Sequence, residues 1–175
     1  RKFFCISVDF SNENRKHTIM KICVLSQTLN SRTGAGVFTG SLVGGVKRSS
    51  PDIEFSVITS ENHIKPGFYR LLKNWPHIRS EIKKSDIVHA LDGYPYGVVA
   101  YLANVGISKP IIITAIGTGS IRKLSNFGWR PWLLRWAYRR VTQVTAISHY
   151  VAQEIKKVLP NLSIKVINHG VDYDF

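Results

Sequence analysis

The feature of this 175-residue chain that most constrains its fold is a regular alternation of two kinds of segment. Short β-branched runs without polar alternation occur at residues 20–27, 54–59, 86–91, 110–115, 143–147 and 164–167. Such runs are typical of strands buried on both faces, as in a parallel sheet covered by helices. Amphipathic runs at 37–48, 68–84 (interrupted near Pro76), 97–105, 132–140 and 149–158 predict helices between the strands. The sequence therefore predicts an α/β fold with a doubly wound, mainly parallel, Rossmann-like sheet.

The pattern also predicts how the chain is divided. Residues 1–19 precede the first predicted strand and are polar and irregular in their second half, so we expect an N-terminal extension there. Residues 20–175 have the length of one domain. The last predicted strand runs into a glycine turn at the end of the sequence. A βα series that closes in this way predicts the first half of a two-domain protein, with the second domain absent from this chain.

The net charge of +13 and a pI near 10 imply an anionic partner, such as nucleic acid, anionic lipid or a phosphorylated substrate. No apolar run approaches the ~20 residues that span a bilayer. Cys5 and Cys23 have no paired spacing. We therefore expect a reduced, cytoplasmic setting.

Ligands of a doubly wound sheet bind outside the carboxyl ends of its strands. The candidate positions at these ends are Thr28 with the loop to Gly36, Ser60, Asp92 and Gly93, Gly117 and Thr118, Ser148, and Asn168 and His169. No series of nucleophile, base and acid stands out among them, and no histidines have metal-ligand spacing. Asp92 is the one candidate for a catalytic base, and no metal is expected.

Gly34, Ala35 and Gly36 precede the first predicted helix. Glycines at that position let the backbone approach a phosphate, and the helix N-terminus offers free N–H groups. The stretch is a loose relative of the dinucleotide fingerprint, but about six residues separate it from the strand, where a true fingerprint turns at once. A flexible turn that feeds the helix is the alternative. For the loop at Gly117 and Thr118, ligand contact and a simple glycine turn are the two interpretations.

Aromatic residues alternate with arginines between residues 127 and 140, and this segment has no acid. It suits a membrane surface, where aromatic rings lie at the headgroups and arginines pair with phosphates. It also suits single-stranded nucleic acid, and the helical spacing of Trp132, Leu133 and Trp136 allows ordinary core packing with a solvated basic face. The residues assigned to an anionic-partner surface are Arg122, Lys123, Trp129, Arg130, Trp132, Arg135, Trp136, Arg139 and Arg140.

Six segments together resemble the N-terminal domain of a family-4 glycosyltransferase, of the retaining, GT-B, "group 1" type. They are MKICVLSQ, GAGVFTGSL, DIVHALDG, ITAIGTGS, VTAISHYVAQEI and VINHGVD, in this order along residues 20–175. The resemblance implies that this domain mainly binds the acceptor and that the absent domain binds the nucleotide-sugar donor. It implies a UDP- or GDP-sugar co-substrate and no further cofactor.

The resemblance also implies roles for particular residues. Ala35 and Gly36 correspond to a Gly-Gly loop near the donor diphosphate, Gly117 and Thr118 to the loop beside the reacting sugar, Ser148 to the serine that ends the fifth strand, and His169 to the start of the interdomain linker. Two positions depart from the family. Ile116 stands where many members have histidine, and Ala35 replaces the first glycine.

On this basis we expect transfer of a sugar, with retention, to a polysaccharide, lipid-linked or other acceptor in the cell envelope. The protein would lie in the cytoplasm or on the inner face of the membrane, and this domain alone would be inactive. One alternative is a non-catalytic basic module that binds a nucleotide or nucleic acid. Another is a GT-B sugar-nucleotide epimerase, for which only Asp92 and Glu61 could supply the carboxylates.

Overall fold

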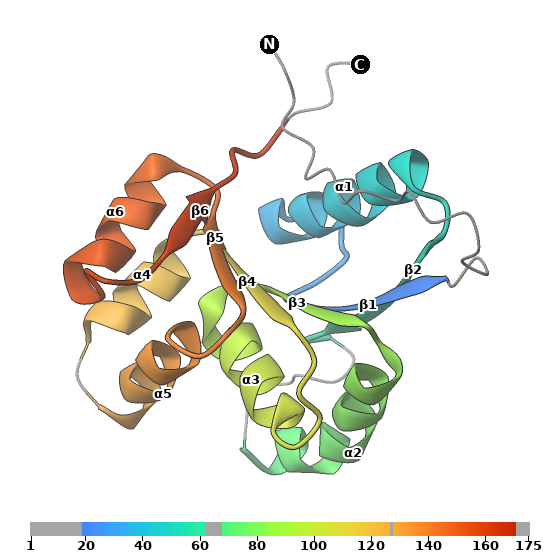
Figure 1. Ribbon diagram of the computed structural model, residues 1–175, viewed down its shortest axis with the longest axis horizontal. Coiled ribbons are helices and arrows are strands. Elements are labelled where there is room, and N and C mark those ends of the chain that lie inside the picture. Colours follow the sequence, from blue (N-terminus) through green and yellow to red (C-terminus); the bar gives the residue numbers. More distant parts are fainter. Residues whose placement is uncertain (1–18, 62–67, 127, 171–175) are drawn as a thin grey trace, which may run out of the picture.

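The computed structural model describes residues 19–61, 68–126 and 128–170, and only the backbone of residues 68–72, 118, 119 and 122. Almost all of the predicted extension lies outside these ranges. Six parallel strands form one sheet in the order β2-β1-β3-β4-β5-β6, as Figure 1 shows. The strands are β1 (Met20–Ser26), β2 (Ile53–Thr59), β3 (Ile87–Leu91), β4 (Ile111–Ala115), β5 (Gln143–Ala146) and β6 (Ile164–Val166). The predicted doubly wound, Rossmann-like α/β fold is confirmed.

The strand register places one row of apolar side chains across the whole sheet. Its members are Ile58, Leu25, Ala90, Ile113, Val144 and Ile164, each paired with the next. The first five are almost completely buried. Because successive residues of a strand point to opposite faces, this row defines the face that carries the main core.

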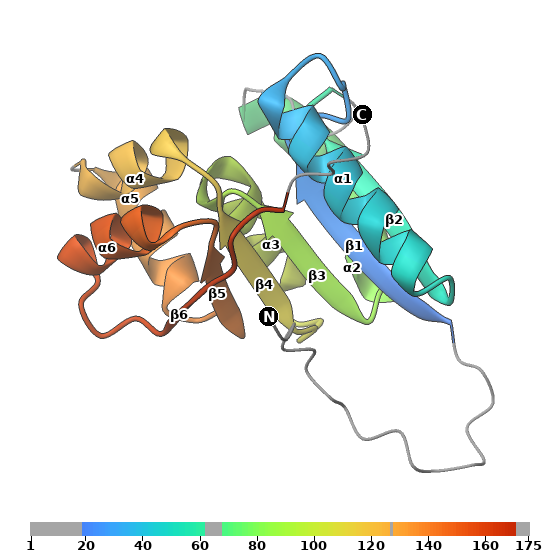
Figure 2. The same cartoon turned by 90° about the horizontal axis from the view of Figure 1, so that it is seen from above.

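Five helices supply the other side of that core. They are α2 (Phe68–Lys84), α3 (Val98–Asn104), α4 (Thr118–Ser125), α5 (Trp129–Tyr138) and α6 (His149–Val158). Each contributes a fully buried side chain to one cluster: Ile82, Ala100, Leu124, Leu134 and Ile155. Helix α1 (Gly34–Ser49) lies on the other face over β1 and β2, and Figures 1 and 2 show it there by itself among the described helices.

Four helices differ from the predictions. Helix α1 begins at Gly34, three residues early, because Thr33 caps it and accepts a hydrogen bond from the Gly36 N–H at 3.1 Å. Helix α2 continues through Pro76 without interruption. Helix α4 was not predicted at all, and α5 begins at Trp129 and not at residue 132. The predicted helix at 97–105 begins at Val98 and is preceded by a turn over Gly93–Gly97 in which Tyr94 is extended.

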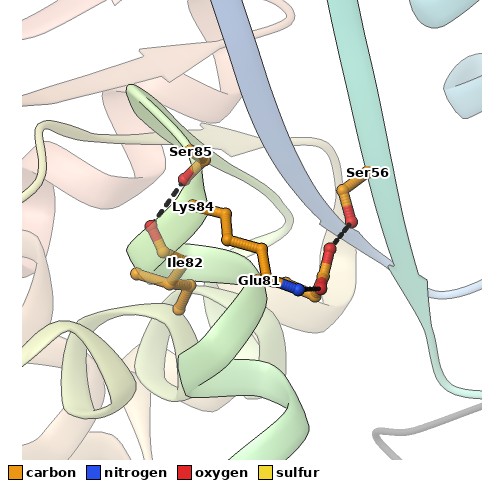
Figure 3. Close-up of polar contacts among 5 residues, drawn as sticks. All are labelled: Ser56, Glu81, Ile82, Lys84 and Ser85. Atoms are coloured by element: carbon orange, nitrogen blue, oxygen red, sulfur yellow. Dashed lines mark hydrogen bonds and ion pairs between the residues drawn. The ribbon is translucent and has the colours of Figure 1, made fainter.

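The C-terminus of α2 is joined to β2 by a polar cluster near the amino ends of β1 and β2, shown in Figure 3. Ser56 Oγ donates to Glu81 Oε2 at 2.6 Å, and Lys84 Nζ pairs with Glu81 Oε1 at 3.1 Å. These contacts hold the pKa of Glu81 below its ordinary value, and the hydrogen bond from Ser56 has the largest effect. Lys21 pairs with Glu54 at 3.0 Å beside this cluster. Because the polar groups of this shallow pocket pair with one another, we interpret it as structural.

Gly93 lies against the ring of Tyr138, and a Cβ at this position would come within 2.8 Å of the Tyr138 Cζ and 2.9 Å of a Leu134 methyl. Both side chains are buried, so neither has space to move. Gly93→Ala should therefore lower the free energy of unfolding by about 2 kcal/mol or more, measured by urea denaturation. Gly45→Ala is the matched control. Its Cβ would meet nothing within 4 Å inside α1. The alanine should therefore raise the free energy of unfolding by about 1 kcal/mol, because alanine favours the helix. Equal effects of the two variants would contradict this packing.

Candidate functional site

The carboxyl ends of the six parallel strands bring the predicted site positions to one edge of the molecule. Along this edge lie Thr28, Ser60, Asp92, Gly117, Ser148 and His169. These residues come from six different connections, so the fold alone explains their common edge. Their detailed contacts divide them into those that hold the scaffold and those that remain available to a ligand.

The first helix presents free backbone groups at this edge. Among the described residues, the N–H groups of Gly34 and Ala35 have no hydrogen-bond partner, whereas the Gly36 N–H bonds to the Thr33 side chain. Gly36 packs directly on Asn30, whose carbonyl oxygen would overlap any Cβ there. Gly36 is thus required by packing. Gly34 is open to solvent and is available to a ligand.

The loop between β1 and α1 is held by a network of hydrogen bonds. The Thr28 hydroxyl donates to the Glu61 carboxylate and accepts from the Asn30 N–H at 2.9 Å. Asn30 in turn accepts from the Arg32 and Thr33 N–H groups at 3.0 Å. Glu61 therefore helps to hold the loop through one of its carboxylate oxygens.

Asp92, at the end of β3, has the most unusual backbone at the edge. Its φ of 90° is in the left-handed region, which costs a non-glycine residue free energy and is concentrated at functional sites. Its Oδ1 accepts from the Gly93 N–H at 2.9 Å, and the same N–H also bonds to Ser120 Oγ at 2.8 Å. Burial raises the pKa of Asp92 to about 6, which the bond from Gly93 only partly offsets. The carboxyl is therefore partly protonated near neutral pH and can donate or accept a hydrogen bond.

Two tyrosines surround Asp92. The Tyr96 hydroxyl is hydrogen-bonded to the Ser60 hydroxyl, which ties the turn after β3 to the end of β2. The Tyr138 hydroxyl is buried beneath Gly93 without a hydrogen-bond partner among the described residues, and its pKa is raised by burial. Ser120 lies near enough to moderate that shift but not in hydrogen-bonding geometry. The arrangement makes the Asp92 turn rigid from both sides.

The loop after β4 and the start of α6 differ in what they leave free. Gly117 is the extended residue before α4 and has no capping side chain, while the side chain of Thr118 lies outside the described residues. Ser148 caps α6 by accepting from the Val151 N–H at 3.2 Å. The Ser148 hydroxyl thus already has a structural role, whereas the backbone at Gly117 is open.

His169 packs its ring on Phe38 of α1, with the ring centroids 4.6 Å apart. The two rings border a pocket of about 390 Å³ on the α1 side of β3 to β6. Its floor carries a hydrogen-bonded chain from His89 Nε2 to Thr114 Oγ1 (2.7 Å) and on to Thr145 Oγ1 (2.7 Å).

Sequence reasoning interpreted His89 as a core residue with its hydrogen bonds satisfied. The bond to Thr114 agrees with that interpretation, and burial lowers the His89 pKa to about 4. However, His89 also lines the pocket, which the sequence did not indicate. The available signal was the pair of polar residues Gln143 and Thr145, which share one face of β5.

The basic, aromatic segment lies apart from this pocket. Trp129 and Trp132 are 65% and 60% exposed, so neither belongs to the core. Arg135 donates to the carbonyls of Leu124 and Asn126, and thereby caps α4. The side chain of Arg122 lies outside the described residues. The assignment of this segment to an anionic partner stays a prediction.

Two features are absent from the described residues. No group of three His, Cys, Asp or Glu side chains there is arranged to hold a metal ion. No helix in the described part of the chain has the length and apolar content needed to cross a bilayer.

Comparison with known proteins gives one family. The model of the family described as Glycosyltransferase Family 4 matches residues 39–175. Among curated proteins none matches the sequence. Among solved structures, the chain is similar to the crystal structure of a conserved protein from Enterococcus faecalis V583. That similarity has 13% identity and a TM-score of 0.41, and it covers 86% of this chain and 92% of that one. The family match starts after Gly34, Ala35 and Gly36, so the role of that loop stays a prediction.

A pair of glycine variants separates packing from ligand contact in the first turn of α1. Gly36→Ala places a Cβ on the Asn30 backbone and should lower the free energy of unfolding by about 2 kcal/mol. Gly34→Ala meets nothing within 4 Å, so its stability should stay within about 0.5 kcal/mol of the wild type. Urea denaturation measures both. A large loss in Gly34→Ala would show that the loop is packed differently.

The raised pKa of Asp92 predicts a pH-dependent stability. A carboxyl whose pKa is about 6 when folded and about 4 when unfolded favours the protonated form in the fold. The free energy of unfolding should therefore fall by about 3 kcal/mol as the pH rises through that interval. Asp92→Asn lacks this loss. Urea denaturation at about pH 4 and about pH 7 should show that the free energy of unfolding of the variant rises relative to that of the wild type as the pH increases. Parallel pH profiles of the two proteins would contradict the assignment.

Proposed function

The chain belongs to glycosyltransferase family 4, and from this premise we propose that it is the acceptor-side domain of an enzyme that transfers a sugar from a nucleotide-sugar donor. The proposed donor is a UDP- or GDP-sugar, and the proposed acceptor is a polysaccharide or a lipid-linked sugar of the cell envelope. Transfer would retain the anomeric configuration. The proposed setting is the cytoplasm or the inner face of the membrane, and the reaction needs no metal.

The observation that carries the proposal is the pair of available groups on the carboxyl edge. Free N–H groups at Gly34 and Ala35, at the positive end of α1, suit the diphosphate of a donor. The half-buried Asp92 carboxyl, at the end of the neighbouring strand β3 on the same edge, suits a sugar hydroxyl of the acceptor. An edge with an anion site and a hydroxyl site matches the two substrates of glycosyl transfer.

The proposed mechanism needs little covalent chemistry from the protein. The donor phosphate helps to deprotonate the acceptor hydroxyl on the same face of the sugar, so no strong base is required. The α1 N-terminus stabilises the departing diphosphate, and Asp92 orients the acceptor through a hydrogen bond. The backbone at Gly117 would contact the reacting sugar. Ile116 occupies the position where many family members have histidine, so that contact is left to the backbone here.

The structure offers less support for the two alternatives. An epimerase needs two free carboxylates in the cleft, and Glu61 is bonded to Thr28. A basic module for a nucleotide or nucleic acid is favoured by the net charge of +13. It remains the second candidate, because charge alone does not distinguish it from a transferase.

Nuclear magnetic resonance of the isotopically labelled chain tests the proposal. Addition of UDP, GDP or an oligosaccharide acceptor should shift the amide signals of Gly34, Asp92 and Gly117 and leave those of Glu81 and Ser85, at the opposite end of the sheet, unchanged. Asp92→Asn should weaken acceptor binding by roughly tenfold, the loss of one hydrogen bond to a charged group. Glu154→Gln, which removes a half-buried carboxylate paired with Lys157 on α6, is the control.

The proposal also predicts no turnover by this domain alone, since the donor would be held mainly by a second domain. Turnover of a sugar nucleotide by the purified chain would show that the donor site is misplaced. Tight binding of a single-stranded oligonucleotide without shifts at the carboxyl edge would favour the basic module.

A further inference from the structure

Helix α5 presents an aromatic face to the outside. Its buried residues are Pro131, Leu134, Ala137 and Tyr138, which follow helical spacing and define the inward side. The same spacing places Trp129, Trp132 and Trp136 together on the opposite side. Trp129 and Trp132 are 65% and 60% exposed, whereas large apolar side chains on a soluble surface are normally scattered singly.

The tryptophans are organised with one another. Trp132 and Trp136 stack with ring centroids 6.1 Å apart and an interplanar angle of 9°. Trp136 also meets the edge of Tyr101 on α3 at 4.6 Å. These contacts fix the rings in place. The side chains of the aromatic face are therefore already ordered in the absence of a partner.

Cations surround the aromatic face without any acid. Residues 93–153 contain seven Lys or Arg residues and no Asp or Glu. The Arg130 guanidinium lies 5.2 Å from the Trp129 ring centroid, and that of Arg140 lies 5.0 Å from Trp136. Arg139, the C-cap residue of α5, is also exposed. Arg135 is committed to α4, so the charges available to a partner on α5 are Arg130, Arg139 and Arg140.

The arrangement distinguishes among partners. Arg130 lies over one face of the Trp129 ring and Arg140 over one face of the Trp136 ring, so bases stacked on those faces would have to displace the guanidinium groups. A second copy of the chain would bring like charges together, because no carboxylate lies among these arginines. An anionic bilayer meets both features, since indole rings are stable at the headgroup level and arginines pair with lipid phosphates.

We propose that the outward face of α5 docks on an anionic membrane, with Trp129 and Trp132 at the level of the headgroups and Arg130, Arg139 and Arg140 on the phosphates. The inference concerns a surface outside the carboxyl edge and holds whichever reaction that edge supports. It assigns peripheral binding and no insertion across the bilayer.

Tryptophan fluorescence with lipid vesicles tests the proposal on the purified chain. Vesicles of equal parts phosphatidylcholine and phosphatidylglycerol should shift the emission to the blue and expose it to quenching by brominated lipid. Vesicles of phosphatidylcholine alone should bind far less, and added salt should release the protein. Because each surface cation contributes about fivefold to binding, the triple variant Arg130→Gln/Arg139→Gln/Arg140→Gln should lose roughly 100-fold.

Matched variants separate this face from general charge and from folding. Lys47→Gln/Lys83→Gln/Lys156→Gln removes the same charge from exposed positions on α1, α2 and α6, and should bind much as the wild type does. Trp129→Ala/Trp132→Ala should lose at least tenfold, while Trp75→Phe, on α2, should lose nothing. Circular dichroism checks that each variant folds; the substituted positions are exposed except Trp75, which packs against the core.

Three results would overturn the proposal. The first is an unchanged emission with anionic vesicles, and the second is equal loss in both charge triples. The third is displacement of the vesicles by a single-stranded oligonucleotide that binds more tightly, or by self-association of the chain. Failure of the proposed transferase function is seen separately, because the amide shifts at Gly34, Asp92 and Gly117 need no lipid.

Discussion

The apolar row that crosses all six strands is the constraint on which the rest of the structure depends. It draws α2, α3, α4, α5 and α6 to one face of the sheet, while α1 covers β1 and β2 on the other. Beyond the part of the sheet that α1 covers, the same face of the strands carries His89, Thr114 and Thr145 in place of aliphatic side chains. A pocket lies above these three residues. The uneven cover of the sheet thus determines where a cavity lies.

The same packing makes the candidate site rigid. Gly93 sits on the buried ring of Tyr138, and this contact fixes the turn in which Asp92 takes its positive φ. The turn is held again by Ser120 from α4, which follows β4. The geometry of the site therefore depends here on the packing of the core. A substitution of Tyr138 or Leu134 would change the position of Asp92, although neither residue contacts a ligand.

The strands could be predicted from the sequence because buried β-branched runs depend on local composition. Local signals also placed the site positions, since the ends of parallel strands share an edge. Helix α4 could not be predicted in the same way. Its residues are small, polar or cationic except Ile121 and Leu124, and its stability comes from the contact of Leu124 with the core. The left-handed backbone of Asp92 and the pocket beside His169 depend on contacts between distant segments, which no local pattern encodes.

The distribution of charge links the two proposed surfaces. The pKa of Asp92 is raised by burial, and no cation among the described side chains lowers it, although the chain carries a net charge of +13. Lys123, the cation of α4 whose side chain the structure describes, lies 5.9 Å from the centroid of the Tyr94 ring and does not pair with Asp92. Among the described side chains, positive charge is therefore not gathered around the carboxyl that is proposed to hold the acceptor. It is concentrated on outer surfaces such as α5, where its effect is to attract a large anionic partner and not to tune the chemistry of the site.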